Sequence, residues 1–137
     1  MTPVIVESPY AGDTEAVIAR NVAYARLALR FALLHGFAPF ASHLLYTQPG
    51  VLDDGVPWQR ALGIKAGLHL GERCQETWLF IDWGISRGMR QGYTAAARAG
   101  RPYRLVTLGD WDGSRVGRPL LPELRPAPID LREFNEH

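Results

Sequence analysis

A short apolar run followed by a turn and a helical pattern is the feature that most constrains this chain. Residues 78–81 (Trp-Leu-Phe-Ile) are aromatic and aliphatic throughout and are bounded by polar residues, which is typical of a buried strand. Asp82 is the first charge after this run, and Gly84 permits a sharp turn. Ser86 is a good N-cap for a helix that continues to Ala99. This unit places a carboxylate and free helix N–H groups at the end of a strand, where open parallel sheets bind ligands.

The same alternation of strand and helix patterns recurs along the chain. Strand-like runs cover residues 2–7, 37–40, 78–81 and 103–108, and helical patterns cover residues 15–35, 57–72 and 86–99. Strands that alternate with helices predict a parallel sheet whose right-handed crossovers place helices on both faces. We therefore expect an α/β, Rossmann-like three-layer sandwich with a parallel sheet of four to five strands in the order 2-1-3-4. The switch point lies between strands 1 and 3, so the segments that follow these two strands should flank one cleft.

Length and composition limit the remaining options. The 137 residues suit one compact domain, which we expect at residues 1–110, followed by a Pro-rich extended tail at 111–137 with a short helix from about residue 129 as an option. A net charge of +1 argues against a nucleic-acid polymer as a partner. No apolar run reaches the roughly 18 residues of a membrane helix, and no signal-peptide pattern is present. The single cysteine, Cys74, fits a packing role in a reducing compartment, so we expect a cytoplasmic protein with no membrane partner.

Two neighbouring segments suggest a specialised surface. Residues 41–57 form a long connection whose aromatic and apolar content favours an ordered, functional loop. In the helical segment that follows, Gly63, Gly67 and Gly71 recur every four residues. Each costs about 1 kcal/mol relative to alanine in a helix, so close packing of another backbone is expected to compensate. The glycine spacing and the apolar helix faces predict a homo-oligomer.

Two aspartates are the candidate catalytic residues. Asp82 could bind a ribose hydroxyl or act as a general base, although a carboxylate at this position also caps a helix or is simply solvated. Asp54, next to Asp53 in the long connection, could serve acid–base or divalent-metal chemistry, although two acids before a glycine also form a turn. His43 and His69 lack the paired spacing of a zinc site. We expect neither a metal nor a cofactor.

Candidate binding residues surround these aspartates. The Ser86 hydroxyl and the N–H groups that follow it could cradle a phosphate or a sugar hydroxyl, or Ser86 is an ordinary N-cap. Arg87 and Arg90 lie in the first helical turn, where positive charge opposes the helix dipole and therefore hints at an anionic ligand. Tyr10 could stack on a base or merely pack. Arg60 could clamp a phosphate or pair with an aspartate.

Several short motifs occur in a recognisable order over about residues 4–109. They are Ser8-Pro9-Tyr10, Asn21, Ser42-His43-Leu44, Asp82 with residues 84–89 (Gly-Ile-Ser-Arg-Gly-Met), and Ala96 with residues 100–102 (Gly-Arg-Pro). In this order and spacing the chain resembles the nucleoside 2-deoxyribosyltransferase-like superfamily, especially its small phage and actinobacterial branch. The resemblance implies a Rossmann-like fold, cleavage of the bond between base and deoxyribose, and a homo-oligomer. The predicted substrate-binding set is Ser8, Tyr10, His43, Arg60, Ser86, Gly88 and Met89.

The chain departs from that superfamily at the nucleophile. The resemblance implies a glutamate four residues before Ala96 and eight before Gly100, and both counts arrive at Gly92. We therefore expect Asp82 or Asp54 to activate water directly, without a glutamyl ester. The sequence predicts a nucleoside- or nucleotide-binding protein acting as an N-glycosidase on a small-molecule substrate. The alternatives are a non-catalytic nucleotide sensor or sequestering protein on the same fold, and a purely structural module.

Overall fold

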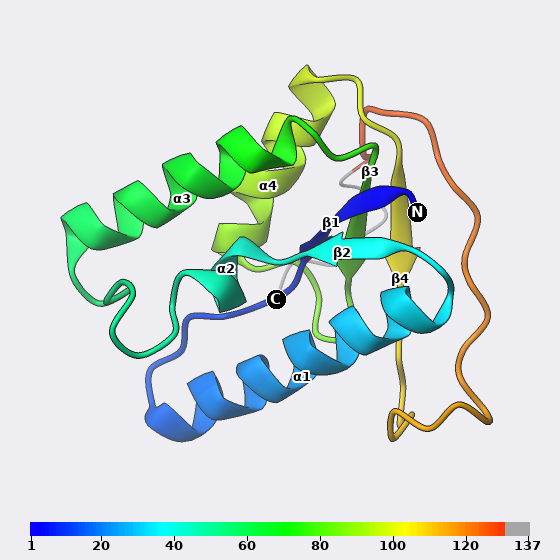
Figure 1. Ribbon diagram of the computed structural model, residues 1–137, viewed down its shortest axis with the longest axis horizontal. Helices are drawn as coiled ribbons and strands as arrows, with labels where there is room; N and C mark the ends of the chain where they lie inside the picture. The colour runs from blue at the N-terminus through cyan, green and yellow to red at the C-terminus, as the bar shows by residue number, and fades with distance from the viewer. Residues whose placement is uncertain (131–137) are drawn as a thin grey trace.

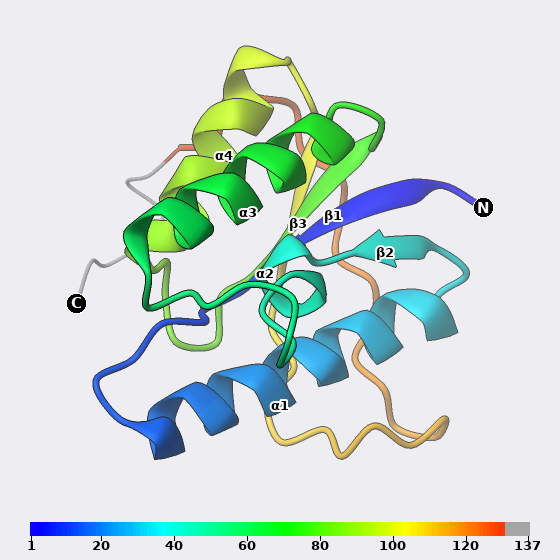
Figure 2. The same ribbon diagram turned by 60° about the vertical axis from the view of Figure 1, so that its left-hand side comes forward.

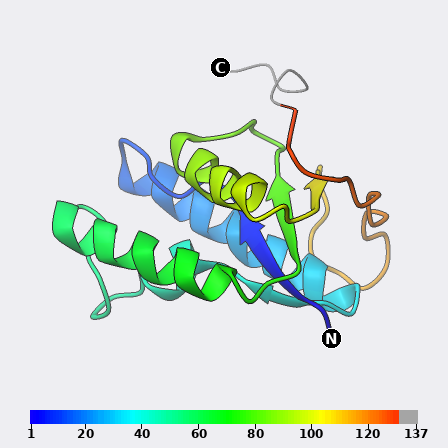
Figure 3. The ribbon, with the colours of Figure 1, turned by 90° about the horizontal axis from the view of Figure 1, so that it is seen from above.

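A parallel sheet forms the middle layer of the computed structural model, which describes residues 1–130 (Figure 1). Its strands are β1 (Pro3–Glu7), β2 (Ala38–Phe40), β3 (Glu76–Phe80) and β4 (Tyr103–Val106). Every neighbouring pair is parallel, in the order β2-β1-β3-β4. The helices are α1 (Glu15–Leu34), α2 (Ser42–Leu45), α3 (Pro57–Gly71) and α4 (Arg87–Arg98). Helix α1 covers one face of the sheet, and α3 and α4 lie over the other (Figures 2 and 3). The predicted Rossmann-like α/β sandwich and its strand order are confirmed.

Alternate residues of the strands point to different layers. Val4 and Val6 of β1 are buried in the same cluster as Phe31 of α1. Trp78 and Phe80 of β3 belong to that cluster as well. Leu79, between them, packs instead with Met89 of α4 in a second cluster on the opposite face. This period of two is the ordinary geometry of a strand, and it decides which layer each strand-end side chain faces.

Local sequence signals set the ends of the helices. The Thr14 hydroxyl accepts a hydrogen bond from the Val17 N–H at 3.1 Å, so Thr14 is the N-cap of α1. Pro57 begins α3, where its missing N–H leaves no intrahelical bond unmade. Gly36 follows α1 with φ of 85° and Gly100 follows α4 with φ of 66°, a conformation that favours glycine. The predicted helix bounds therefore agree with the structure within a residue or two.

The two connecting regions contain more structure than the sequence predicted. Residues 41–57 include the short helix α2, which was expected to be irregular. The chain after β4 runs along the outer side of the sheet (Figure 1), and Tyr103 and Arg125 exchange two backbone hydrogen bonds of 3.0 and 2.8 Å. The helix predicted from about residue 129 lies almost wholly outside the described residues. Within residues 1–130, no helix has the length and apolar character needed to cross a membrane.

Candidate functional site

A cavity of about 590 Å³, which we call the main cavity, lies between the end of β1, α2, α3 and the beginning of α4. Its volume is in the range of small-molecule binding sites. All of the predicted substrate-binding residues except Met89 line it, and so does Asp54. The other polar and charged side chains on its wall are Glu7, Ser42, Tyr46, Thr47, Gln59, Arg87, Gln91 and Arg101. The segments after strands 1 and 3 therefore do flank one cleft.

Glycines allow the walls of the main cavity to come close together. A Cβ at Gly67 would lie 2.6 Å from the Ser42 side chain of α2, and a Cβ at Gly71 would lie 2.8 Å from the Ile5 Cδ1 of β1. The glycine spacing of α3 thus permits close approach, as the sequence predicted. The neighbouring atoms belong to side chains of α2 and β1, whereas a second backbone had been expected.

Glu7, the last residue of β1, is a carboxyl group that the sequence reasoning missed. It faces the main cavity and has no hydrogen-bond or ion-pair partner among residues 1–130. Its carboxyl group lies against Gly92 of α4, because a Cβ built at Gly92 would be 2.6 Å from Glu7 Oε2 and nearer still to Oε1 and Cδ. A carboxyl group is therefore present beside the α4 position where the sequence lacks one. The available signal was its place at a strand end, next to Ser8.

Burial changes the protonation of Glu7. Desolvation raises the pKa of its carboxyl group from 4.5 to about 8, although the positive charge of Arg101 acts in the opposite direction. Glu7 is therefore mostly protonated at neutral pH and can donate a proton into the cavity. A strongly shifted carboxyl group in a cavity is typical of catalytic sites.

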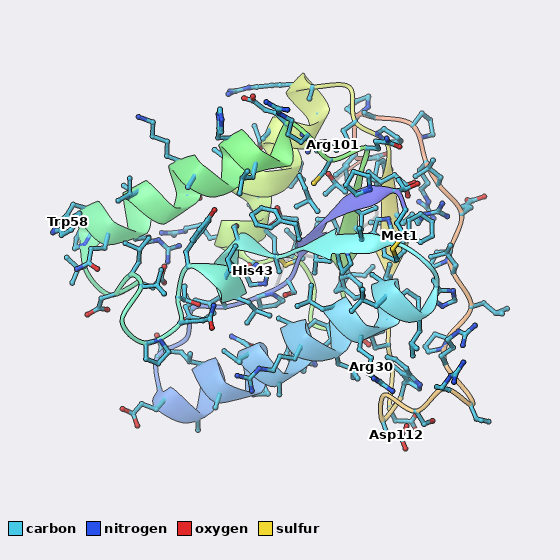
Figure 4. All side chains as sticks on the ribbon, viewed as in Figure 1. Met1, Arg30, His43, Trp58, Arg101 and Asp112 are labelled. Atoms are coloured by element: carbon cyan, nitrogen blue, oxygen red, sulfur yellow. The ribbon has the colours of Figure 1, made fainter. Side chains whose placement is uncertain are left out.

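Ser8 and His43 form a polar contact on the cavity wall. Ser8 Oγ lies 2.6 Å from His43 Nε2, which joins the loop after β1 to α2. Burial lowers the pKa of His43 to about 4, so the imidazole is neutral at physiological pH. The pair holds the Ser8 hydroxyl in place, and Figure 4 shows His43 on α2 beside the sheet. Asn21 of α1 steadies the same loop by donating from Nδ2 to the backbone oxygen of Tyr10 at 2.9 Å.

The beginning of α4 supplies another part of the wall. Ser86 accepts a hydrogen bond from the Met89 N–H at 3.3 Å and caps the helix. Ser86, Arg87 and Gly88 line the main cavity. Met89 was predicted to bind substrate, but its side chain is only 1% exposed and packs with Leu79 in the core. The reason is helical geometry, since Met89 lies on the face of α4 that meets the sheet.

Asp54 and Arg60 form an ion pair at one end of the cavity. Arg60 Nη1 donates to Asp54 Oδ2 at 2.7 Å, and the two side chains are 36% and 23% exposed. Both residues also line a second hollow of about 800 Å³ between the long connection and the beginning of α1. The pair thus stands where the two hollows meet. Asp53 lines the second hollow only, and its Oδ1 accepts the Gly55 N–H at 2.9 Å, the turn contact that the sequence had offered as an alternative.

Asp82 lies outside both hollows, contrary to its predicted place across the cleft from Ser8 and Tyr10. Its carboxylate accepts hydrogen bonds from the Leu108 N–H at 2.9 Å, from the Gly109 N–H at 2.8 Å and from the Tyr24 hydroxyl. Asp82 therefore joins α1 to the chain that leaves β4. The side chain has the same parity as Trp78 and Phe80, and so it points to the α1 layer.

No metal centre is apparent within residues 1–130, where no group of three or more His, Cys, Asp or Glu side chains could hold an ion. Fold and cavity together define a Rossmann-like α/β protein with a site of small-molecule size at the carboxyl edge of its sheet. More particularly, the chain belongs to the family described as a domain of unknown function, DUF7768, whose model matches residues 2–106. No curated protein and no solved structure matches the chain.

Proposed function

We propose that this protein is a nucleoside- or nucleotide-binding enzyme that hydrolyses the bond between base and deoxyribose, as a member of the nucleoside 2-deoxyribosyltransferase-like superfamily. One observation carries the proposal. The Glu7 carboxyl group, unpartnered within residues 1–130, lies against Gly92 in a cavity of small-molecule size. The resemblance implies a glutamate at position 92 on α4, and Glu7 brings the same functional group to that place from β1.

Glu7 serves this reaction as an acid and then as a base. The protonated carboxyl group donates its proton to the base nitrogen while the C1′–N bond breaks and its electron pair stays with the base. The carboxylate that remains stabilises the positive charge on the sugar ring. Water then adds at C1′ and returns a proton to Glu7, so the products are free base and deoxyribose, and Glu7 is regenerated.

The neighbouring residues suit the substrate. Tyr10, on the loop after β1, offers an aromatic ring to the base. The Ser8 hydroxyl, held by His43, offers a hydrogen bond to a sugar hydroxyl. Asp54, the remaining acid on the wall, stays our candidate for the residue that activates water. We assign no such part to Asp82, because its carboxylate is fully engaged elsewhere.

A homo-oligomer is part of the proposal. Trp58 and Leu62, one turn apart on α3, are 67% and 50% exposed, and Trp58 projects from the outer end of the helix (Figure 4). An exposed apolar helix face is a common feature of subunit interfaces. Light scattering at micromolar concentration should give a mass above that of the single chain, and a monomer would contradict this part.

The glycosidase is tested by incubating the full chain with deoxynucleosides and their 5′-monophosphates and measuring free base by chromatography. Glu7→Gln keeps the shape of the side chain but removes its titrating proton, so kcat should fall by about 10²- to 10⁴-fold. Glu72→Gln is the matched control, because Glu72 is exposed at the end of α3 and does not line the cavity. Base release that survives Glu7→Gln would refute the role of Glu7. Binding without any release would instead favour the sensor or sequestering protein.

A further inference from the structure

Positive side chains outnumber ionised acids on the wall of the main cavity. Arg60, Arg87 and Arg101 line it, and the acids of that wall are Asp54 and Glu7. The carboxyl group of Glu7 is mostly protonated at neutral pH, because burial raises its pKa to about 8. The imidazole of His43 is neutral there as well, since burial lowers its pKa. A partly enclosed site with excess positive charge attracts an anion.

The guanidinium of Arg60 has donors to spare. It carries five N–H groups, and within residues 1–130 only Nη1 makes a hydrogen bond, to the Asp54 carboxylate. The side chain is 36% exposed and stands where the main cavity meets the second hollow. The guanidinium can therefore contact a ligand group at the mouth of the cavity, where the two hollows meet, without any movement of α3.

Arg87 is hard to explain as a structural residue. It is the first residue of α4, where a positive charge opposes the helix dipole and lowers helix stability. Its side chain is exposed, lines the main cavity, and has no hydrogen-bond or ion-pair partner among residues 1–130. An anion bound near this helix start would offset the unfavourable interaction between the Arg87 charge and the helix dipole.

We propose that the cavity takes its nucleoside in phosphorylated form, with the phosphate bound by Arg60 and assisted by Arg87, and with Asp54 as the counter-ion of Arg60 in the empty site. The nucleoside part of this ligand rests on the proposed function. The planar fork of a guanidinium matches two phosphate oxygens, so phosphate can replace the carboxylate of Asp54 on Arg60. The phosphate, which is strongly hydrated, stays at the mouth while the sugar and base lie inside.

The experiment measures affinities of the full chain for three kinds of probe by calorimetry: a panel of deoxynucleosides, their 5′-monophosphates, and inorganic phosphate. The monophosphate should bind at least about tenfold more tightly than its nucleoside, and raising the salt concentration should reduce this ratio. Arg60→Gln should bring the ratio close to one while nucleoside affinity changes by less than about twofold. Arg87→Gln should reduce the ratio by a smaller factor. Arg26→Gln, on the exposed side of α1 and outside both hollows, is the matched control and should change nothing.

Several outcomes would overturn the inference. Equal affinity for nucleosides and monophosphates would do so, as would a ratio that survives Arg60→Gln in a protein whose circular dichroism is unchanged. Inorganic phosphate that binds as tightly as the monophosphate would reveal a general anion site in place of a nucleotide site. Base release with the same kcat/KM from both substrates would refute the phosphate preference and leave the glycosidase standing. Preferential binding of monophosphates that stay intact would support the phosphate preference and refute the glycosidase. If no probe binds, both the phosphate preference and the proposed function are refuted.

Discussion

Glu7 and Asp82 are two carboxyl groups at the carboxyl edge of the same sheet, and their surroundings differ in every respect. Asp82 accepts hydrogen bonds from two backbone N–H groups and a tyrosine hydroxyl. Glu7 has no such partner within residues 1–130 and faces a cavity. A group that is fully paired stabilises the fold, whereas an unpaired group beside a cavity is available to a ligand. Position at a strand end is therefore a weaker guide to function than the layer that the side chain faces.

The parity of each strand explains the difference. Glu7 follows Ile5 by two residues, so both side chains line the cavity on the side of α3 and α4. Asp82 follows Phe80 by two residues and points to the side of α1, where Tyr24 meets it. The two acids thus serve opposite layers of one sandwich, although both come from central strands.

The largest contrast should come from removing the charge of Asp82. Asp82→Asn weakens hydrogen bonds made to a charged acceptor, so the free energy of unfolding should fall by about 1.5–3 kcal/mol. Its kcat/KM, measured well below the melting temperature, should stay within about threefold of the wild type because the side chain is outside the cavity. Glu7→Gln should show the opposite pattern, with activity lost and no loss of stability. An Asp82→Asn protein of normal stability and no activity would return Asp82 to catalysis.

A methyl group at Gly92 tests the position of Glu7 directly. Gly92→Ala places its Cβ on the Glu7 carboxyl group, and we expect a loss of about 1–3 kcal/mol in the free energy of unfolding. In a Glu7→Ala background the same change should stabilise the protein by about 0.5–1 kcal/mol, because alanine is the better helix residue. Denaturant unfolding of the four proteins measures this coupling. The same loss in both backgrounds would mean that Glu7 does not lie against α4.

The pH dependence of stability gives the smallest effect. The pKa of Glu7 is raised in the folded protein, to about 8 from 4.5, so the folded state holds a proton that the unfolded state releases. The stability associated with this group is present below pH 4.5 and is lost as the pH rises through about 8. Glu7→Gln should therefore gain about 1–2 kcal/mol over the wild type at pH 8.5, after allowance for solvent in the cavity, and nothing at pH 4.5.

The pKa shift of His43 has the opposite sign to that of Glu7, and its effect on stability cancels when the wild type is compared with Glu7→Gln. Its pKa is lowered from 6.5 to about 4, so the unfolded state binds a proton that the folded state excludes. Stability from this source rises with pH between about 4 and 6.5 in both proteins. Differences in melting temperature between wild type and Glu7→Gln across pH 4.5–8.5 isolate the carboxyl group. A difference that does not change with pH would show that Glu7 titrates normally.

Much of the fold follows from local patterns. Capping residues such as Ser86 and apolar runs such as residues 78–81 predicted the helices, the strands and their order, although β3 begins at Glu76 and ends at Phe80. Helix α2 escaped prediction because it has four residues and its N-cap, Ala41, makes no side-chain hydrogen bond. Contacts with α3 and with Ser8, in the loop after β1, hold it in place, and a local pattern does not record them.

The candidate site was only partly predictable. Ser8, Tyr10 and Ser86 were expected to share one cleft, and they line the same cavity. Met89 was expected there but is buried in the core, because it lies on the face of α4 that meets the sheet. Glu7 follows a strand just as Asp82 does, and the sequence does not show which of these two carboxyl groups faces a cavity.

The sequence by itself determined the alternation of strands and helices, and with it the strand order and the edge at which the cavity lies. These features depend on residues close together in the chain, whose periodicity and caps are visible in one dimension. The tertiary structure alone decided which carboxyl group faces the cavity and which is held by hydrogen bonds within the fold. That choice depends on contacts across layers, Glu7 with Gly92 and Asp82 with Tyr24, between residues far apart in the chain.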